Sequence, residues 1–291
     1  MMASGKRLGP RPAPFRVGLR RKPIYWCDTC AYTLPMLPQQ QGSFPLFNAF
    51  GIQVLVHWSW FILPVLVFQS GHHRQFSSQV WTAIELLTIF GIVLMHEFGH
   101  ALACRSVGGK ADRIVLWPLG GVAYVQPPQR PGAVLWSIIA GPLVNAILVP
   151  ILFLADMAVN HWIAGVSPDV IRYVHWMYVL NLVLLIFNML PVYPLDGGQT
   201  LHAILWYFIG RARSLQIVAT IGIVVAVAAG AWAAYTNNTW FVIMAVFVGL
   251  QAFQGWRVSQ ILVRVEAAER DERERQRRWM EGGADDFEQR G

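Results

Sequence analysis

The sequence predicts an all-α polytopic membrane protein, with about six transmembrane helices and a short β or re-entrant segment after the second helix. Apolar residues make up 55% of the 291 residues and charged residues only 13%, about half the charged share of a soluble domain. Long apolar runs recur along the chain, each roughly 17–25 residues long, enough to cross the hydrocarbon core as a helix. We expect the six spans at 52–69, 80–104, 133–158, 173–193, 214–235 and 239–256.

Basic residues outside the spans predict the orientation. If the N-terminus is cytoplasmic, the inner side receives the basic residues up to Lys22, those of the loop 105–130, Arg211 and Arg213, and the arginines from Arg257 onward. Only Arg74 and Arg172 then lie outside, so the positive-inside rule favours cytoplasmic positions for both termini. We interpret the net charge of +7 as a topology signal and as affinity for anionic lipid, not as a nucleic-acid-binding surface.

Two polar regions flank the membrane domain, which we expect at 46–257. Residues 1–45 are basic, Pro-rich and poorly patterned, so we expect a mobile cytoplasmic leader. Its Cys27 and Cys30 form a lone CxxC, which we interpret as incidental thiols rather than a redox pair or half of a zinc site, because no second pair exists. Residues 258–291 are dense in Arg and Glu at i,i+3 and i,i+4 spacings, which favours a solvated cytoplasmic helix. The alternative is a contact surface for a regulator.

The second expected span carries the string His96-Glu97-Phe98-Gly99-His100. A charged side chain near the bilayer centre costs about 2.5 kcal/mol or more, so a carboxylate and two imidazoles in an apolar helix need a reason. Histidines at i and i+4 share one helix face and can bind one Zn²⁺, and the adjacent Glu97 is placed to act on a zinc-bound water. The string therefore indicates a zinc site inside the membrane.

A zinc site of this kind needs a third protein ligand, and membrane depth selects it. The second span runs inward, so His96 and His100 lie toward its cytoplasmic end. The candidates after them are Asp112, Asp156, His161, Asp169, His175, Asp196, His202 and Glu266. Asp196 is the one expected at the depth of the histidines, where the fourth span reaches the cytoplasmic side. His202 lies six residues further on and can turn away on the next helix. A plainer interpretation of Asp196 is the N-cap of a helix at 199–210.

Three motifs resemble those of the site-2 protease family of intramembrane zinc metalloproteases: HEFGH at 96–100, GPLVN at 141–145 and NMLPVYPLDGG at 188–198. The resemblance covers about residues 45–255. It implies cleavage of membrane-embedded peptides, with His96, His100 and Asp196 as zinc ligands and Glu97 as the catalytic base. It also implies that Asn145 and Asn188 face the site and the substrate, although either can simply tie helices together. We expect the minimal form, without a PDZ or CBS domain.

The segment Ile114–Val125, IVLWPLGGVAYV, is rich in β-forming residues and is split by Pro118 and Gly120-Gly121. It follows the second span directly. We expect a strand or re-entrant hairpin that pairs with an extended substrate, and the family resemblance points the same way. The alternative is a plain interfacial loop.

The sequence thus predicts an intramembrane zinc endopeptidase with one Zn²⁺ per chain. The expected partners are the lipid bilayer and a membrane-protein substrate, typically with a single span, and no nucleic acid. The expected location is a bacterial inner membrane, crossed several times. One rival is a zinc enzyme whose third ligand is a later Glu, but no Glu occurs between Glu97 and Glu266. Another is a catalytically silent or metal-transporting protein that keeps the motif; transporters tend to show two related halves with interrupted helices, and none is evident here.

Overall fold

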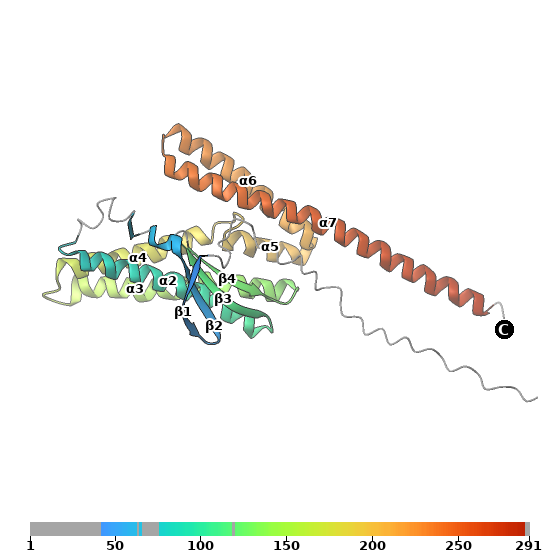
Figure 1. Cartoon of the computed structure of the whole chain (residues 1–291), viewed down its shortest axis with the longest axis horizontal. Helices are drawn as coiled ribbons and strands as arrows, with labels where there is room; N and C mark the ends of the chain where they lie inside the picture. Colours follow the sequence, from blue (N-terminus) through green and yellow to red (C-terminus); the bar gives the residue numbers. More distant parts are fainter. Residues whose placement is uncertain (1–41, 63, 66–75, 118–119, 289–291) are drawn as a thin grey trace, which may run out of the picture.

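The computed structural model describes residues 42–62, 64–65, 76–117 and 120–288. Within these ranges the chain is mostly helical and carries one small β-sheet (Figure 1). Residues 1–41, with Cys27 and Cys30 of the expected leader, lie outside the described residues. The elements are β1 (Ser43–Ala49), β2 (Ile52–His57), the 3-10 turn η2 (Trp58–Phe61), α2 (Gln79–Ser106), β3 (Lys110–Trp117), β4 (Gly120–Gln126), α3 (Pro131–Met157), the π-helical turn η4 (Ala158–Trp162), α4 (Pro168–Asn188), α5 (Asp196–Ile209), α6 (Arg211–Tyr235) and α7 (Thr239–Glu288).

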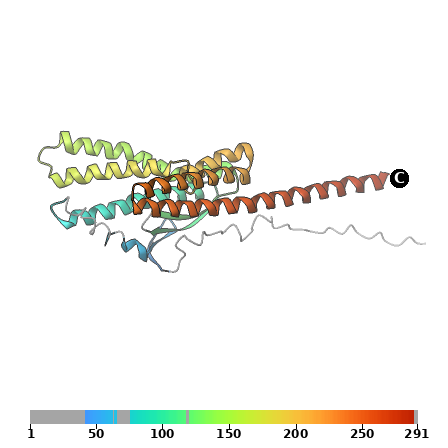
Figure 2. The ribbon, with the colours of Figure 1, turned by 90° about the horizontal axis from the view of Figure 1, so that it is seen from above.

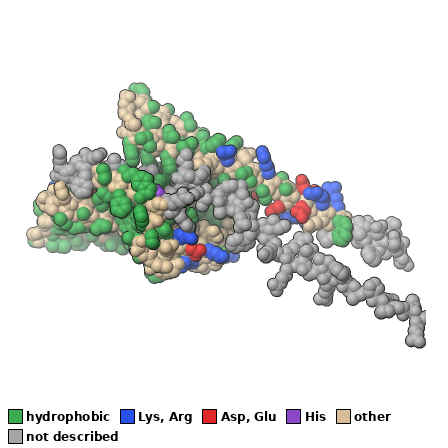
Figure 3. Space-filling view, in the orientation of Figure 1, with side chains coloured by type: hydrophobic (Ala, Val, Ile, Leu, Met, Phe, Trp, Pro, Cys, Tyr) green, Lys and Arg blue, Asp and Glu red, His purple; other side chains and the backbone are tan. Residues whose placement is uncertain are grey.

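Among the described residues, five helices are long and apolar enough to cross a membrane: α2, α3 with η4, α4, α6 and the first part of α7. They correspond to the second through sixth expected spans, so the chain is an integral membrane protein. On the face seen in Figure 3 the side chains over the helices are largely apolar, whereas charged side chains gather on the extension of α7 and at the lower end of the sheet.

The expectation of a helix at the start of the first run, 52–69, is wrong, because Ile52–His57 is strand β2. Phe50 and Gly51 both adopt positive φ values, 54° and 69°, and so form a two-residue turn that folds β2 back onto β1. The guanidinium of Arg105 donates to the carbonyl oxygens of both turn residues. An apolar run alone does not distinguish a buried strand from a helix. The same hairpin takes Ser43–Pro45, which the sequence assigned to the leader, into β1.

The sheet has the order β1-β2-β3-β4, in which β2 and β3 are parallel and both outer pairs are antiparallel. The parallel pair is joined through α2, as such a pair requires a crossover. Ile52 and Val54 of β2 pack with Ile114 and Leu116 of β3 against the last turns of α2. The segment 114–125 is therefore a hairpin of two strands, and its sheet covers the end of α2 that carries the HEFGH string.

The helices form two groups. Helices α2, α3 and α4 run side by side, while α6 and α7 form a hairpin that diverges from them (Figures 1 and 2). Helix α5 links the two groups. Helix α7 continues without a break from the last span into the charged tail, as far as Glu288. The charged part of the helix carries i,i+4 ion pairs such as Arg273–Glu269 at 3.5 Å.

Candidate metal centre

Helix α2 presents His96 and His100 on one face, one turn apart. The helix begins after Ser78, whose side chain accepts a hydrogen bond from Val80 N, and it has no internal proline. Two glycines let α3 approach this face closely. A Cβ on Gly99 would lie 2.6 Å from Ala140 O, and a Cβ on Gly141 would lie 2.3 Å from His100 Nε2. Gly141 of the GPLVN motif therefore leaves the room that the imidazole of His100 occupies.

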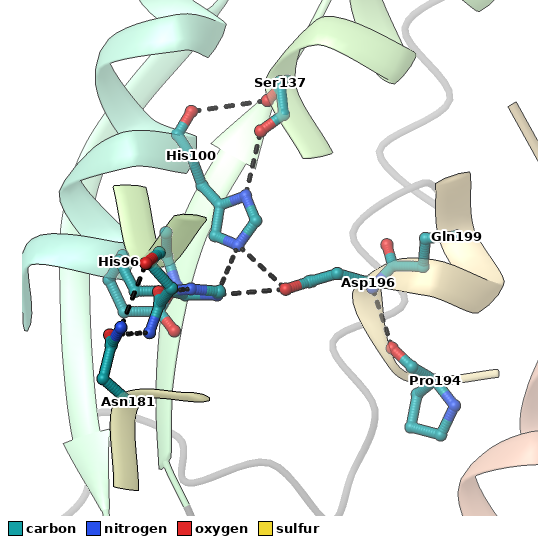
Figure 4. Close-up of polar contacts among 10 residues, drawn as sticks. His96, His100, Ser137, Asn181, Pro194, Asp196 and Gln199 are labelled. Carbon is teal, nitrogen blue, oxygen red and sulfur yellow. Dashed lines mark hydrogen bonds and ion pairs between the residues drawn. The ribbon is translucent and has the colours of Figure 1, made fainter. Parts of the chain in front are cut away.

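Asp196 completes a cluster with the two histidines (Figure 4). Its Oδ2 lies 3.0 Å from His96 Nε2 and 3.4 Å from His100 Nε2. The two Nε2 atoms are 3.1 Å apart. Ligand atoms around a tetrahedral Zn²⁺ lie about 3.3 Å from one another, given bonds of about 2.0–2.1 Å. The three observed spacings fit that value, so one zinc ion suits this donor set. The described residues contain one such group.

Hydrogen bonds on the other side of each ring orient the imidazoles. His96 Nδ1 lies 2.7 Å from Asn145 Oδ1, and His100 Nδ1 lies 2.9 Å from the carbonyl oxygen of Ser137. Both partners are acceptors, so each ring donates from Nδ1 and directs Nε2 toward the cluster, where it is available to a metal ion. A bond of this kind fixes the tautomer and ring orientation of a metal-binding histidine.

Asn181 of α4 extends this network, and sequence reasoning did not find it. It is fully buried, accepts from Asn145 Nδ2 at 2.9 Å and donates to the Asn145 carbonyl oxygen at 3.0 Å. These bonds tie α3 to α4 and hold the Asn145 amide in place. The available signal was a polar side chain within an apolar span, which is uncommon unless it has a partner. Asn188, at the end of α4, is half-buried, and the described contacts do not join it to the cluster.

Glu97 is buried beside the cluster and rests against β4. Its Oε2 accepts a hydrogen bond from Ala123 N at 2.8 Å. A Cβ on Gly121 would lie 2.4 Å from Glu97 Cγ. The GG sequence at the start of β4 therefore provides the space for the carboxylate side chain, and the strand holds one of its oxygens.

The position of Asp196 on α5 differs from the plainer interpretation of the sequence. Helix α5 begins at Asp196, with Leu195 as N-cap, so Asp196 is not the N-cap of a helix at 199–210.

Other candidate zinc ligands from the sequence have different partners and lie away from the cluster. His202 Nδ1 lies 2.8 Å from Ser214 Oγ, Asp156 contacts His175, and Glu266 accepts from Ala212 N.

Known proteins resemble the chain over its membrane part. The family model of peptidase family M50 matches residues 84–162 and 156–229. A zinc metalloprotease of Methanocaldococcus jannaschii is 30% identical over 219 residues, which are 75% of this chain and 62% of that protein. Stage IV sporulation protein FB of Bacillus subtilis is 25% identical over 217 residues, with 71% and 67% covered. The chain thus spans less than two thirds of the length of the first of these relatives. The solved site-2 protease from Methanocaldococcus jannaschii superposes with a TM-score of 0.55 and 29% identity, covering 74% of this chain and 95% of that one.

Proposed function

The chain belongs to peptidase family M50, and from that premise we propose that it is a zinc endopeptidase that hydrolyses peptide bonds in or near the transmembrane segments of membrane proteins. The observation that carries the proposal is the convergence of His96, His100 and Asp196, whose ligand atoms all lie within 4.8 Å of one another, next to the carboxylate of Glu97. The relatives that bear metalloprotease and site-2 protease names favour this function over a silent or metal-transporting protein.

The roles of the residues follow from their contacts. His96, His100 and Asp196 would hold one Zn²⁺ per chain. Zinc, when bound, supplies a water that loses its proton near neutral pH and polarises a carbonyl group. Glu97 would accept a proton from the attacking water and pass it to the departing amine nitrogen. Asn145 and the Ser137 carbonyl keep the two imidazoles turned toward the metal, and the hydrogen bond from Ala123 N limits where the Glu97 carboxylate moves.

Strand β4 is the element that we assign to the substrate. A helix keeps its carbonyl groups in internal hydrogen bonds, so a membrane-embedded target must unwind before hydrolysis. An unwound segment can add to the edge of a sheet. The sheet has two outer strands. Strand β1 carries Pro45 and an irregular register between Pro45 and Phe47, features that block edge pairing. Strand β4 faces Glu97 through Ala123, so an added strand would lie beside the catalytic carboxylate.

A sixth crossing and cytoplasmic termini are part of the proposal. Strand β2 packs near Ala101 and Cys104, at the end of α2 opposite to its start at Gln79. A helix of this length spans about 40 Å, so β2 and the start of α2 lie toward opposite sides of the membrane part, which supports a sixth crossing. The basic residues Arg105, Lys110 and Arg113 lie at and just after the cluster end of α2, which supports a cytoplasmic position for that end.

We place the chain in a bacterial inner membrane. Its proposed substrates are single-span membrane proteins, and the α7 tail is the proposed contact site for a regulator.

Replacing Glu97 by Gln tests the function. The variant should keep one zinc per chain and lose cleavage of a single-span membrane substrate, because the carboxylate that accepts the proton is gone while the three ligands remain. Glu85→Gln is the matched control, since Glu85 is a second buried carboxylate on α2, and it should keep activity. Full activity of Glu97→Gln would exclude the proposed chemistry.

A proline scan of the two outer strands tests the substrate strand. Val122→Pro in β4 should lower cleavage and leave zinc content unchanged, because it distorts the strand that the substrate is proposed to join. Phe47→Pro in β1 is the control on the opposite edge and should have the smaller effect on cleavage. Equal effects of the two substitutions would remove β4 from its proposed role.

A further inference from the structure

The segment between α4 and α5, which leads into Asp196, is packed tightly on the side of α5. A Cβ on Gly197 would lie 2.3 Å from Met189 O, and a Cβ on Gly198 would lie 2.5 Å from Tyr193 N. Contacts this short are not available to a residue with a side chain. The first turn of α5, which begins with Asp196, is therefore seated directly on the backbone of this segment.

The opposite side of the same segment is packed against α6 and α7, again at glycines. A Cβ on Gly222 of α6 would lie 2.7 Å from Tyr193 O, and a Cβ on Gly255 of α7 would lie 2.6 Å from Tyr193 Cε1. The backbone of Tyr193 thus lies in a notch on α6, and its ring lies in a notch on α7. Small residues let helices and backbone approach each other in this way inside a membrane.

Tyr193 is consequently held between two parts of the molecule. It precedes Asp196 by three residues, and the Leu195 N–H donates to the Val192 carbonyl oxygen at 2.8 Å, which closes the intervening turn. The hairpin of α6 and α7 otherwise points away from α2, α3 and α4 (Figure 1). A shift of Tyr193 would therefore move the start of α5 relative to the two histidines on α2.

We propose that Tyr193 is a positioning residue that ties the α6–α7 hairpin to Asp196 and thereby sets the affinity of the cluster for zinc. The inference rests on the proposed zinc site and adds three residues to it that touch no ligand: Tyr193, Gly222 and Gly255. Groups that orient a metal ligand typically change metal affinity about 10- to 100-fold when they are removed.

The test measures the zinc dissociation constant of the purified full chain by competition with a chelating dye. Gly255→Ala should weaken zinc binding about tenfold, because the new methyl group collides with the Tyr193 ring. Gly249→Ala is the matched control: it is the same change on the same helix, but its Cβ would meet only Ala226 Cβ, at an ordinary 3.4 Å, and zinc binding should be unchanged. Equal affinity of these two variants would overturn the proposal.

Removal of the ring gives a second, independent arm. Tyr193→Phe keeps the ring and should bind zinc as the wild type does, whereas Tyr193→Val should bind it more weakly. In the Tyr193→Val background Gly255→Ala should have no further effect, because the atom it would collide with is gone. Gly222→Ala should still weaken binding there, since it collides with the backbone oxygen. Additive effects of Tyr193→Val and Gly255→Ala would show independent packing and contradict the proposal.

The zinc-binding measurements also distinguish a failure of this proposal from a failure of the proposed function. A wild-type chain that binds no zinc refutes the metal centre itself, whatever the variants do. A wild-type chain that binds zinc, with Tyr193→Val binding it equally well, refutes only the role of Tyr193. If Gly255→Ala does not fold, the comparison of Tyr193→Val with Tyr193→Phe decides alone, because neither substitution adds a collision.

Discussion

The Nδ1 atom of His96 lies 2.7 Å from Oδ1 of Asn145, a contact between α2 and α3 within the membrane part of the chain. Asn145 is almost fully buried, and its Nδ2 is held by Asn181 on α4. Three helices therefore combine to fix the orientation of one imidazole. A carbonyl oxygen at this place selects the tautomer whose Nε2 is free for a metal.

Asn145→Ala should weaken zinc binding about 10- to 100-fold, because His96 loses the bond that orients its ring. The zinc dissociation constant measured by chelator competition checks this value. Asn188→Ala is the comparison, since the described contacts do not connect Asn188 with the cluster, and its affinity should match the wild type. If Asn188→Ala loses as much zinc as Asn145→Ala, both asparagines support the site and the contact with His96 is not the deciding one.

The choice of Asp196 as third ligand makes a separate prediction. His96→Ala and Asp196→Ala should each reduce the zinc content of the purified chain from about one ion to near zero, since two remaining protein ligands hold zinc weakly. His202→Ala should retain the ion, because His202 bonds to Ser214 instead. Metal analysis after dialysis gives the answer, and loss of zinc in His202→Ala alone would reverse the ligand assignment.

Most spans could be predicted because lipid leaves few choices. A backbone in hydrocarbon must satisfy its own hydrogen bonds, so an apolar run of sufficient length becomes a helix. Residues 52–57 did not follow this rule. One of their two partner strands, β3, lies far away in the sequence, and such pairing is not visible in a local pattern.

In the candidate site, too, some features could be predicted from the sequence and others could not. The spacing of His96 and His100 and the depth of Asp196 could be derived from the sequence, and the structure brings these three residues together. The contacts of Asn181 and Gly121 could not, because they depend on which helices and strands pack at one level. The role of Asn188 stays a prediction.

Gly121→Ala should separate catalysis from metal binding. The added methyl group would lie 2.4 Å from Glu97 Cγ, so the carboxylate must move, and a misplacement of about 1 Å can lower a rate about 100-fold. Zinc content should stay near one ion per chain because no ligand is touched. Gly91→Ala on α2 meets nothing within 4 Å and serves as the control. Cleavage at the wild-type rate by Gly121→Ala would mean that Glu97 tolerates the displacement or does not act as the base.

The last prediction concerns pH and His202, which lies on α5, outside the candidate spans. Burial, and secondarily the positive charge of Arg211, lower the pKa of His202 from 6.5 to about 4. The unfolded chain therefore binds a proton at His202 that the folded chain does not bind between these two pH values. Linkage then requires that this histidine's contribution to stability is complete above pH 6.5 and declines as the pH falls toward 4. Thermal unfolding of the detergent-solubilised chain at pH 7.5 and pH 5 should show a drop in Tm that is smaller in His202→Gln than in the wild type, because Gln does not titrate. An equal drop in both proteins would assign the acid sensitivity to other groups.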